Sequence, residues 1–183
     1  MIISVLSPHL RYHPAVQKAR VLSRSPDDPI GSPSLFRLSV THPDMDLKAI
    51  LFQALDALVW VSGQRVARLR LQGSEGDAQG VLILEDGCLC TLDLRAGQPA
   101  GLAFEVHGSR GLVQYDDMSN SCAWLQPANE PARNLMPWSE QCRRPAIEGA
   151  QPFPSQADVE RVWRAALASL ADGEVWQAEE VAA

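Results

Sequence analysis

Lysine is scarce in this chain, which carries only Lys18 and Lys48 among its 16 basic residues. That scarcity restricts any mechanism that needs a lysine as an acid, a base or a Schiff-base former. The 12 glycines form neither a G-x-G-x-x-G pattern nor a Walker-type loop, so the sequence lacks the phosphate cradle of dinucleotide-binding enzymes. The nearest glycine cluster, at positions 73, 76 and 80, lies between expected strands, where a hairpin turn is the simpler interpretation.

Basic runs and long apolar runs are also missing. The 16 Lys and Arg residues against 22 Asp and Glu leave a net charge of −6, which argues against non-specific nucleic-acid binding. Apolar runs such as 57–61 are far shorter than the roughly 20 residues that span a bilayer, so we expect no membrane partner. The amino terminus shows no charged leader before an apolar segment, which predicts a cytoplasmic protein.

The four cysteines, at positions 88, 90, 122 and 142, form no C-x-x-C pair, and reduced thiols are expected. Cys88 and Cys90 would lie on the same face of a strand as Leu92 and Leu94, which favours packing in the core over metal binding. The four histidines are scattered without an H-E-x-x-H pattern. The sequence therefore predicts no metal site.

Length and composition predict one globular domain over residues 1–183, since 46% of the residues are apolar and 21% charged. Apolar spacing and capping residues predict three helices, and alternating patterns predict the strands. Asp44 is the expected start of the second helix, and Gly63 its end. The helices are expected at 14–22, 44–63 and 155–173, and the strands at 2–6, 35–41, 65–72, 78–84, 88–94, 102–107 and 112–115. The strands from residue 65 to 115 should form an antiparallel meander.

Residues 127–154 contain six prolines and no apolar periodicity. Such a long irregular segment is typical of a functional cover, a partner-binding arm or a disordered stretch. Its aromatic neighbours Trp124 and Trp138, with Met136, are a candidate contact surface, and packing against the sheet is the alternative.

Asp56 differs from the other carboxylates, most of which fit helix starts, turns or the carboxyl-terminal tail. It lies among the apolar residues Leu55, Leu58 and Val59 of the second helix. A carboxylate at the edge of a buried face either forms a structural hydrogen bond or acquires a perturbed pKa that serves chemistry. The structural hydrogen bond is the more common outcome.

Five segments in a fixed order resemble the second domain of the glucose-fructose oxidoreductase, inositol dehydrogenase and MocA (Gfo/Idh/MocA) family. They cover nearly the whole chain, and each is weak alone. The segments are Arg11-Tyr12-His13-Pro14-Ala15-Val16, Pro29-Ile30-Gly31-Ser32-Pro33, the helix from Phe52 to Trp60 that ends at Gly63, Val106-His107-Gly108-Ser109-Arg110-Gly111-Leu112 followed by Tyr115-Asp116, and the helix from Ser155 to Gly173.

The resemblance implies an α+β fold with an open, mainly antiparallel sheet and helices packed on one face. In that family this domain bears the substrate and often the oligomer interface, whereas a Rossmann domain, absent here, binds the cofactor. The family's catalytic lysine belongs to a Glu-Lys-Pro motif in the Rossmann domain, and neither lysine of this chain has that context. The matched site residues are Asp56 and Gln53, where Gln53 replaces the family's histidine and cannot exchange a proton near neutral pH.

Two functions follow as expectations. In the first, the chain is a stand-alone relative of the substrate-binding and oligomerisation domain, a binding or assembly module without its own cofactor site. In the alternative, it is one half of a split oxidoreductase, and a separate Rossmann-domain chain supplies NAD or NADP. A gene fragment without a retained role is a third interpretation, which a cooperative thermal melt would contradict.

A homodimer through the exposed sheet face is expected as well, although a solvated face is equally consistent with the pattern. The polar residues expected on that face are Arg68, Arg70, Thr91, Asp93, Glu105 and His107.

Overall fold

A computed structural model describes residues 10–24, 30–117, 122–127, 133–134 and 155–178. The expected strand at 2–6 and most of the proline-rich segment 127–154 lie outside the described residues. Trp124 lies on a described strand whose side chains are not described, and Met136 and Trp138 also fall outside. The expectations for these positions therefore stay predictions.

The described residues form a nine-stranded sheet in the order β8-β7-β6-β5-β1-β4-β3-β2-β9. Every neighbouring pair is antiparallel except β1 and β4, which run parallel. The expected α+β class with a mainly antiparallel sheet is confirmed. The strands are β1 (Pro33–His42), β2 (Val66–Gly73), β3 (Asp77–Leu84), β4 (Leu89–Ala96), β5 (Gly101–Gly108), β6 (Gly111–Asp116), β7 (Cys122–Pro127), β8 (Arg133–Asn134) and β9 (Trp176–Gln177).

The expected meander is interrupted by β1, which lies between β4 and β5. Strands that are consecutive in sequence are usually neighbours in a sheet, and β4 and β5 are an exception. The strand between them, β1, lies at the centre of the sheet and buries Phe36, Leu38 and Val40 in the face that the helices cover. The link from β4 to β5 must then cross the end of β1. Backbone bonds fix that crossing, with the amide of Gly97 donating to the carbonyl of His42 at 2.9 Å.

Three α-helices and one short 3-10 turn accompany this sheet in the described part of the chain: η1 (Leu10–Tyr12), α1 (Pro14–Arg24), α2 (Leu47–Ser62) and α4 (Gln156–Asp172). The helix ends are largely those expected. Gly63 ends α2 in the left-handed region, and Ser155 and Asp158 form a capping box on α4. The residue that caps α2 is Asp46 and not Asp44, because the Asp46 carboxylate accepts from the amide of Ala49 at 2.7 Å.

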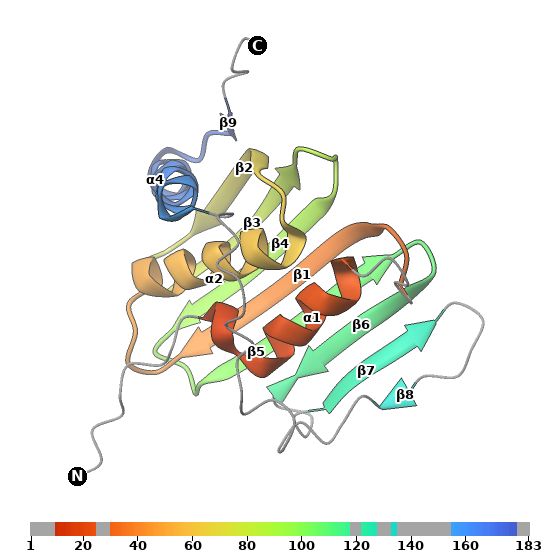
Figure 1. Ribbon diagram of the computed structural model, residues 1–183. Helices are drawn as coiled ribbons and strands as arrows, with labels where there is room; N and C mark the ends of the chain where they lie inside the picture. Colours follow the sequence, from red (N-terminus) through yellow and green to blue (C-terminus); the bar gives the residue numbers. More distant parts are fainter. Residues whose placement is uncertain (1–9, 25–29, 118–121, 128–132, 135–154, 179–183) are drawn as a thin grey trace.

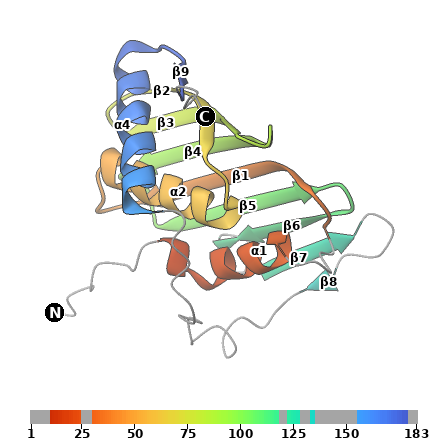
Figure 2. The ribbon, with the colours of Figure 1, turned by 45° about the horizontal axis from the view of Figure 1, so that its top comes forward.

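All three helices cover one face of the sheet, as Figures 1 and 2 show, and α2 lies between α1 and α4. The core sits between this helix layer and the sheet, and it includes both Cys88 and Cys90 as expected. Because α2 contacts the sheet and both other helices, ten of its sixteen residues are buried. Its outward edge carries Lys48, Phe52, Gln53 and Trp60. None of the helices described here has the length and apolarity that crossing a membrane requires.

Candidate functional site

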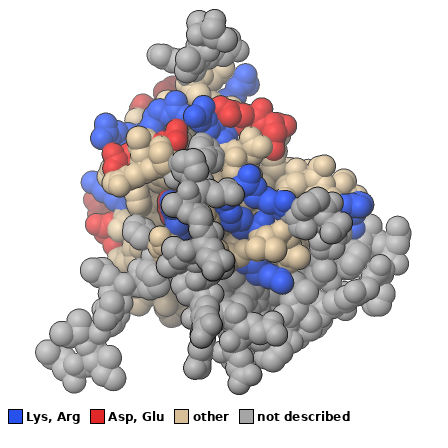
Figure 3. All heavy atoms as spheres, viewed as in Figure 1, with Lys and Arg blue, Asp and Glu red and all other residues tan. Residues whose placement is uncertain are grey.

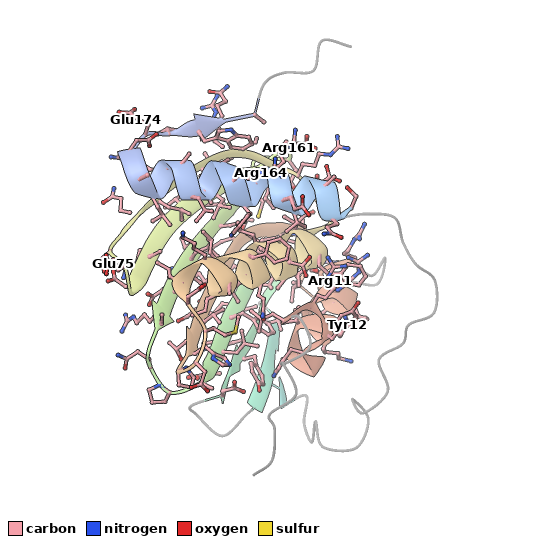
Figure 4. All side chains as sticks on the ribbon, turned by 90° about the vertical axis from the view of Figure 1, so that its left-hand side faces the viewer. Arg11, Tyr12, Glu75, Arg161, Arg164 and Glu174 are labelled. Atoms are coloured by element: carbon pink, nitrogen blue, oxygen red, sulfur yellow. The ribbon has the colours of Figure 1, made fainter. Side chains whose placement is uncertain are left out.

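Asp56 sits on the edge of α2 that faces η1, and it is 3% exposed. Arg11 of η1 donates from Nε to Oδ2 of this carboxylate at 2.7 Å, and from a terminal nitrogen to Oδ1. A two-bond pair of this kind is among the stronger side-chain contacts. The hydrogen bond to Asp56 is the main cause of a raised pKa at Arg11. Figure 4 shows Arg11 and Tyr12 on η1.

The Asp56 carboxylate is thus anchored by a cation from a segment 45 residues away in sequence. Both of its oxygens accept from one guanidinium, and burial keeps it from solvent. A general base must reach the proton that it removes, and this carboxylate instead holds η1 against the centre of α2. The structure therefore contains the hydrogen-bonding partner that one of the two interpretations of Asp56 expects.

Gln53 lies one turn before Asp56 in different surroundings. It lines an open hollow of about 590 Å³ between the start of α2 and α4, and Asp56 does not line it. The Gln53 amide donates to Sδ of Met45 at 3.6 Å, a weak bond that a ligand could replace. The structure therefore places the two expected site residues on one helix but does not bring their functional groups into one pocket.

Aromatic side chains form the apolar wall of this hollow. Phe52 and Trp163 meet edge to face with ring centroids 5.8 Å apart, and the Trp163 indole donates to the carbonyl of Lys48 at 3.0 Å. Charges of both signs surround them. The remaining lining residues are Asp46, Ala49, Glu160 and Arg164. An aromatic wall beside an amide and balanced charges fits a small neutral ligand with polar and apolar faces.

Sequence reasoning missed Trp163, Phe52 and Lys48 as lining residues. Trp163 belongs to the last expected helix, and its position opposite α2 depends on how the two helices pack. A usable signal was present for Phe52, which falls with Gln53 on the polar edge of an otherwise apolar helix. The pairing of Arg11 with Asp56 had no local signal.

Cys88 and Cys90 are both buried and face the core. A hydrogen bond between the two thiols lowers the pKa of Cys88 and raises the pKa of Cys90. Among the residues with described surroundings, no three His, Cys, Asp or Glu side chains come together as metal ligands would. These thiols are therefore assigned to packing.

The face of the sheet opposite the helices carries a second, wider hollow of about 860 Å³. Cross-strand neighbours Leu35, Leu89 and Ile83 form an apolar row on this face. The exposed side chains of Arg68 and Arg70 lie on one flank of the row. On the other flank, Glu105 pairs with Arg37 at 3.3 Å and with His107 at 2.9 Å. The polar residues expected on this face all lie on it.

Comparison with known proteins finds solved structures that share this fold. No protein-family model and no curated protein matches the chain. An oxidoreductase from Thermotoga maritima matches at 15% identity with a TM-score of 0.68, over 93% of this chain and 62% of that one. Levoglucosan dehydrogenase in complex with NADH and L-sorbose matches at 13% identity with a TM-score of 0.72, over 94% and 65%. An oxidoreductase domain protein from Kribbella flavida matches at 18% identity with a TM-score of 0.68, over 94% and 64%.

Likeness at such low identity establishes the fold alone. These neighbours are Gfo/Idh/MocA-type oxidoreductases, so the chain has the fold of one part of such enzymes, as the resemblance implied. The chain spans less than two thirds of the length of each of these three neighbours.

Proposed function

We propose that this chain is a stand-alone relative of the substrate-binding and oligomerisation domain of NAD(P)-dependent oxidoreductases, and that it acts as a binding or assembly module in the cytoplasm without its own cofactor site. The pairing of Asp56 with Arg11 carries the proposal, because it commits the matched carboxylate to holding the fold together. Gln53 adds support, since an amide binds a hydroxyl but does not exchange its proton at neutral pH.

Direct cofactor titration tests this proposal. The isolated protein should show no saturable binding of NADH or NADPH in isothermal titration calorimetry, with a complete nicotinamide-dependent dehydrogenase as the positive control. Binding in the micromolar range or tighter would overturn the proposal, because it would mean that this chain carries a cofactor site.

A second function is favoured by the hollow between α2 and α4, which Gln53 lines together with the exposed side chains of Lys48 and Arg164. In this function a separate Rossmann-domain chain docks there, supplies NAD or NADP and the catalytic lysine, and completes a split oxidoreductase. Intact-mass analysis of the native complex should then find that second chain.

Mixing experiments test the split enzyme. The mixture should turn over substrate with NADH or NADPH, and Gln53→Ala should reduce the rate. Gln79→Ala, an exposed change on the opposite face of the sheet, is the matched control. Absence of turnover with the copurified chain would exclude this second function.

The proposed assembly role includes a homodimer through the open face of the sheet. The apolar row of Leu35, Leu89 and Ile83 supports it, with cationic and acidic groups on its two flanks. A two-fold axis over such a row would bring Arg70 of one copy toward Glu105 of the other.

A further inference from the structure

A histidine interrupts the apolar row on the open face of the sheet. The row continues from β3 to β6, and each member pairs with the next across neighbouring strands. The members are Ile83, Leu89, Leu35, His107 and Leu112. Directly paired residues have their side chains on the same face of a sheet. His107 therefore lies between two leucines, within the surface on which we expect a second copy to dock.

This row and the helices lie on opposite sides of the sheet. Phe36 and Val106, the sequence neighbours of Leu35 and His107, are buried in the core beneath the helices. Figure 3 views the molecule from the helix side, where cationic and acidic side chains both lie on the surface. On the open face, the side chain of His107 is 36% exposed, and Leu89 is 39% exposed. Both are therefore within reach of a second copy.

The hydrogen bonding of His107 fits the neutral form of its ring. Nε2 lies 2.9 Å from Oε2 of Glu105, which precedes it by two residues on β5. An ionised carboxylate only accepts, so Nε2 carries the single ring proton of the neutral form. Nδ1 has no hydrogen-bond partner in the part of the chain that the structure describes. A second proton would bind there and place a charged N–H group beside leucine side chains.

The charges around the ring also oppose a second proton once the face is covered. Glu105 already accepts from Arg37 of β1 at 3.3 Å, so this carboxylate faces one cation before His107 is protonated. In the proposed two-fold contact, Arg70 of the second copy approaches the same carboxylate. A protonated His107 would be a third cation near one acid, and a covered cation that lacks its own acid is costly.

The strand on the other side of His107 supplies no balancing acid. Its facing residues on β6 are Leu112 and Gln114, neither of which titrates. Asp116 lies toward the far end of that strand. Arg110, an exposed residue of the turn after β5, is a further cation. Covering the face therefore favours the neutral ring.

We propose that protonation of His107 weakens the homodimer through the open face, so that the two copies separate in mildly acidic solution. This inference rests on the homodimer of the proposed function and adds its regulation. Histidine changes charge between about pH 5 and pH 8. The free copy binds the proton more readily than the dimer does, because water solvates the imidazolium there. By linkage, a fall in pH then favours the free copies.

Light scattering of the full chain over a range of protein concentrations, at pH 7.5 and pH 5.5 and constant ionic strength, tests this regulation. We expect the dissociation constant of the wild-type dimer to be at least about tenfold higher at pH 5.5. His107→Gln keeps a neutral side chain and should remain dimeric at both pH values. His107→Lys carries a cation at both pH values and should be monomeric at both. The matched control is His42→Gln, two residues beyond the buried Val40 on β1, which should behave as the wild type does.

The outcomes separate this inference from the homodimer itself. A wild-type dimer with the same dissociation constant at both pH values overturns the role of His107 and leaves the homodimer in place. Acid dissociation that persists in His107→Gln overturns this role too, because another group must then cause it. Wild-type chains that are monomeric at both pH values overturn the homodimer, and this inference with it.

Discussion

Arg11 donates two hydrogen bonds to the buried carboxylate of Asp56, and the one from Nε to Oδ2 is 2.7 Å long. The pair joins a 3-10 turn to the middle of a helix that starts 36 residues later. Side-chain exposure is unequal within the pair, at 21% for Arg11 and 5% for Asp56. The guanidinium can therefore reach water if its partner is lost, whereas the carboxylate cannot.

This asymmetry predicts unequal costs of substitution. Arg11→Ala leaves the buried Asp56 carboxylate without its cationic partner and should lower the free energy of unfolding by about 3–5 kcal/mol. Asp56→Ala leaves a cation that can turn outward and should cost about 1–3 kcal/mol. Urea unfolding of both single variants and of the double variant measures these changes in the free energy of unfolding. The double variant should cost less than the sum of the singles, and strict additivity would contradict a coupled pair.

Ser169 of α4 extends the hydrogen bonding of β2 where the neighbouring strand ends. In the described part of the chain, β9 pairs with Arg68 and Leu69, and the Ser169 hydroxyl accepts from the amide of Leu71 at 3.0 Å. Ser169→Ala would leave that buried amide without an acceptor, so we expect a loss of about 1–3 kcal/mol of stability. Ser34→Ala, at an exposed serine of β1, should cost under about 0.5 kcal/mol. Similar unfolding midpoints for the two variants would argue against this role of Ser169.

Gly63 combines a left-handed backbone with a tight contact. Its φ is 63°, and the Arg24 guanidinium fills the space beside it. Gly87 has a φ of 85° and open space around it, so it isolates the backbone contribution. Gly87→Ala should cost about 1 kcal/mol, and Gly63→Ala should cost more because Arg24 must also move. Thermal unfolding of the two variants gives the difference, and an equal shift would mean that the Arg24 contact is unimportant.

Local chemistry explains which parts of the fold were predictable. Gly63, Ser155 and Asp158 mark helix ends through hydrogen bonds within a few residues, and the structure confirms them. The central position of β1 depends on a crossover between distant strands, which no local pattern encodes. The pairing of Arg11 with Asp56 could not be predicted for the same reason, although both residues belong to segments on which the family resemblance rests.

His13 supplies a pH dependence of stability. Its Nδ1 accepts from the amide of Ala15 at the start of α1, at 3.2 Å. Burial lowers the pKa of His13, although Asp117 opposes this shift. The unfolded chain therefore takes up the proton first, and stability should fall as the pH decreases below about 6.5.

Comparison of urea unfolding at pH 7 and pH 5.5 tests this role of His13. The loss of stability on acidification should shrink in His13→Asn, because asparagine still accepts at a helix start but does not titrate in this range. An unchanged pH dependence in that variant would assign the effect to other groups.

Charge reversal tests the open face of the sheet as a dimer interface. Arg68 and Arg70 both project from β2 on the exposed face, beside the row that contains Leu89 and Ile83. If two copies meet there, Arg68→Glu with Arg70→Glu should place like charges opposite the acidic flank and halve the solution mass measured by light scattering.

Arg161→Glu with Arg164→Glu makes the same charge change on α4, on the other side of the molecule, and should leave the mass unchanged. A dimer that survives the first pair of substitutions must use another surface, and a wild-type protein that is monomeric at all concentrations would mean that this face is solvated.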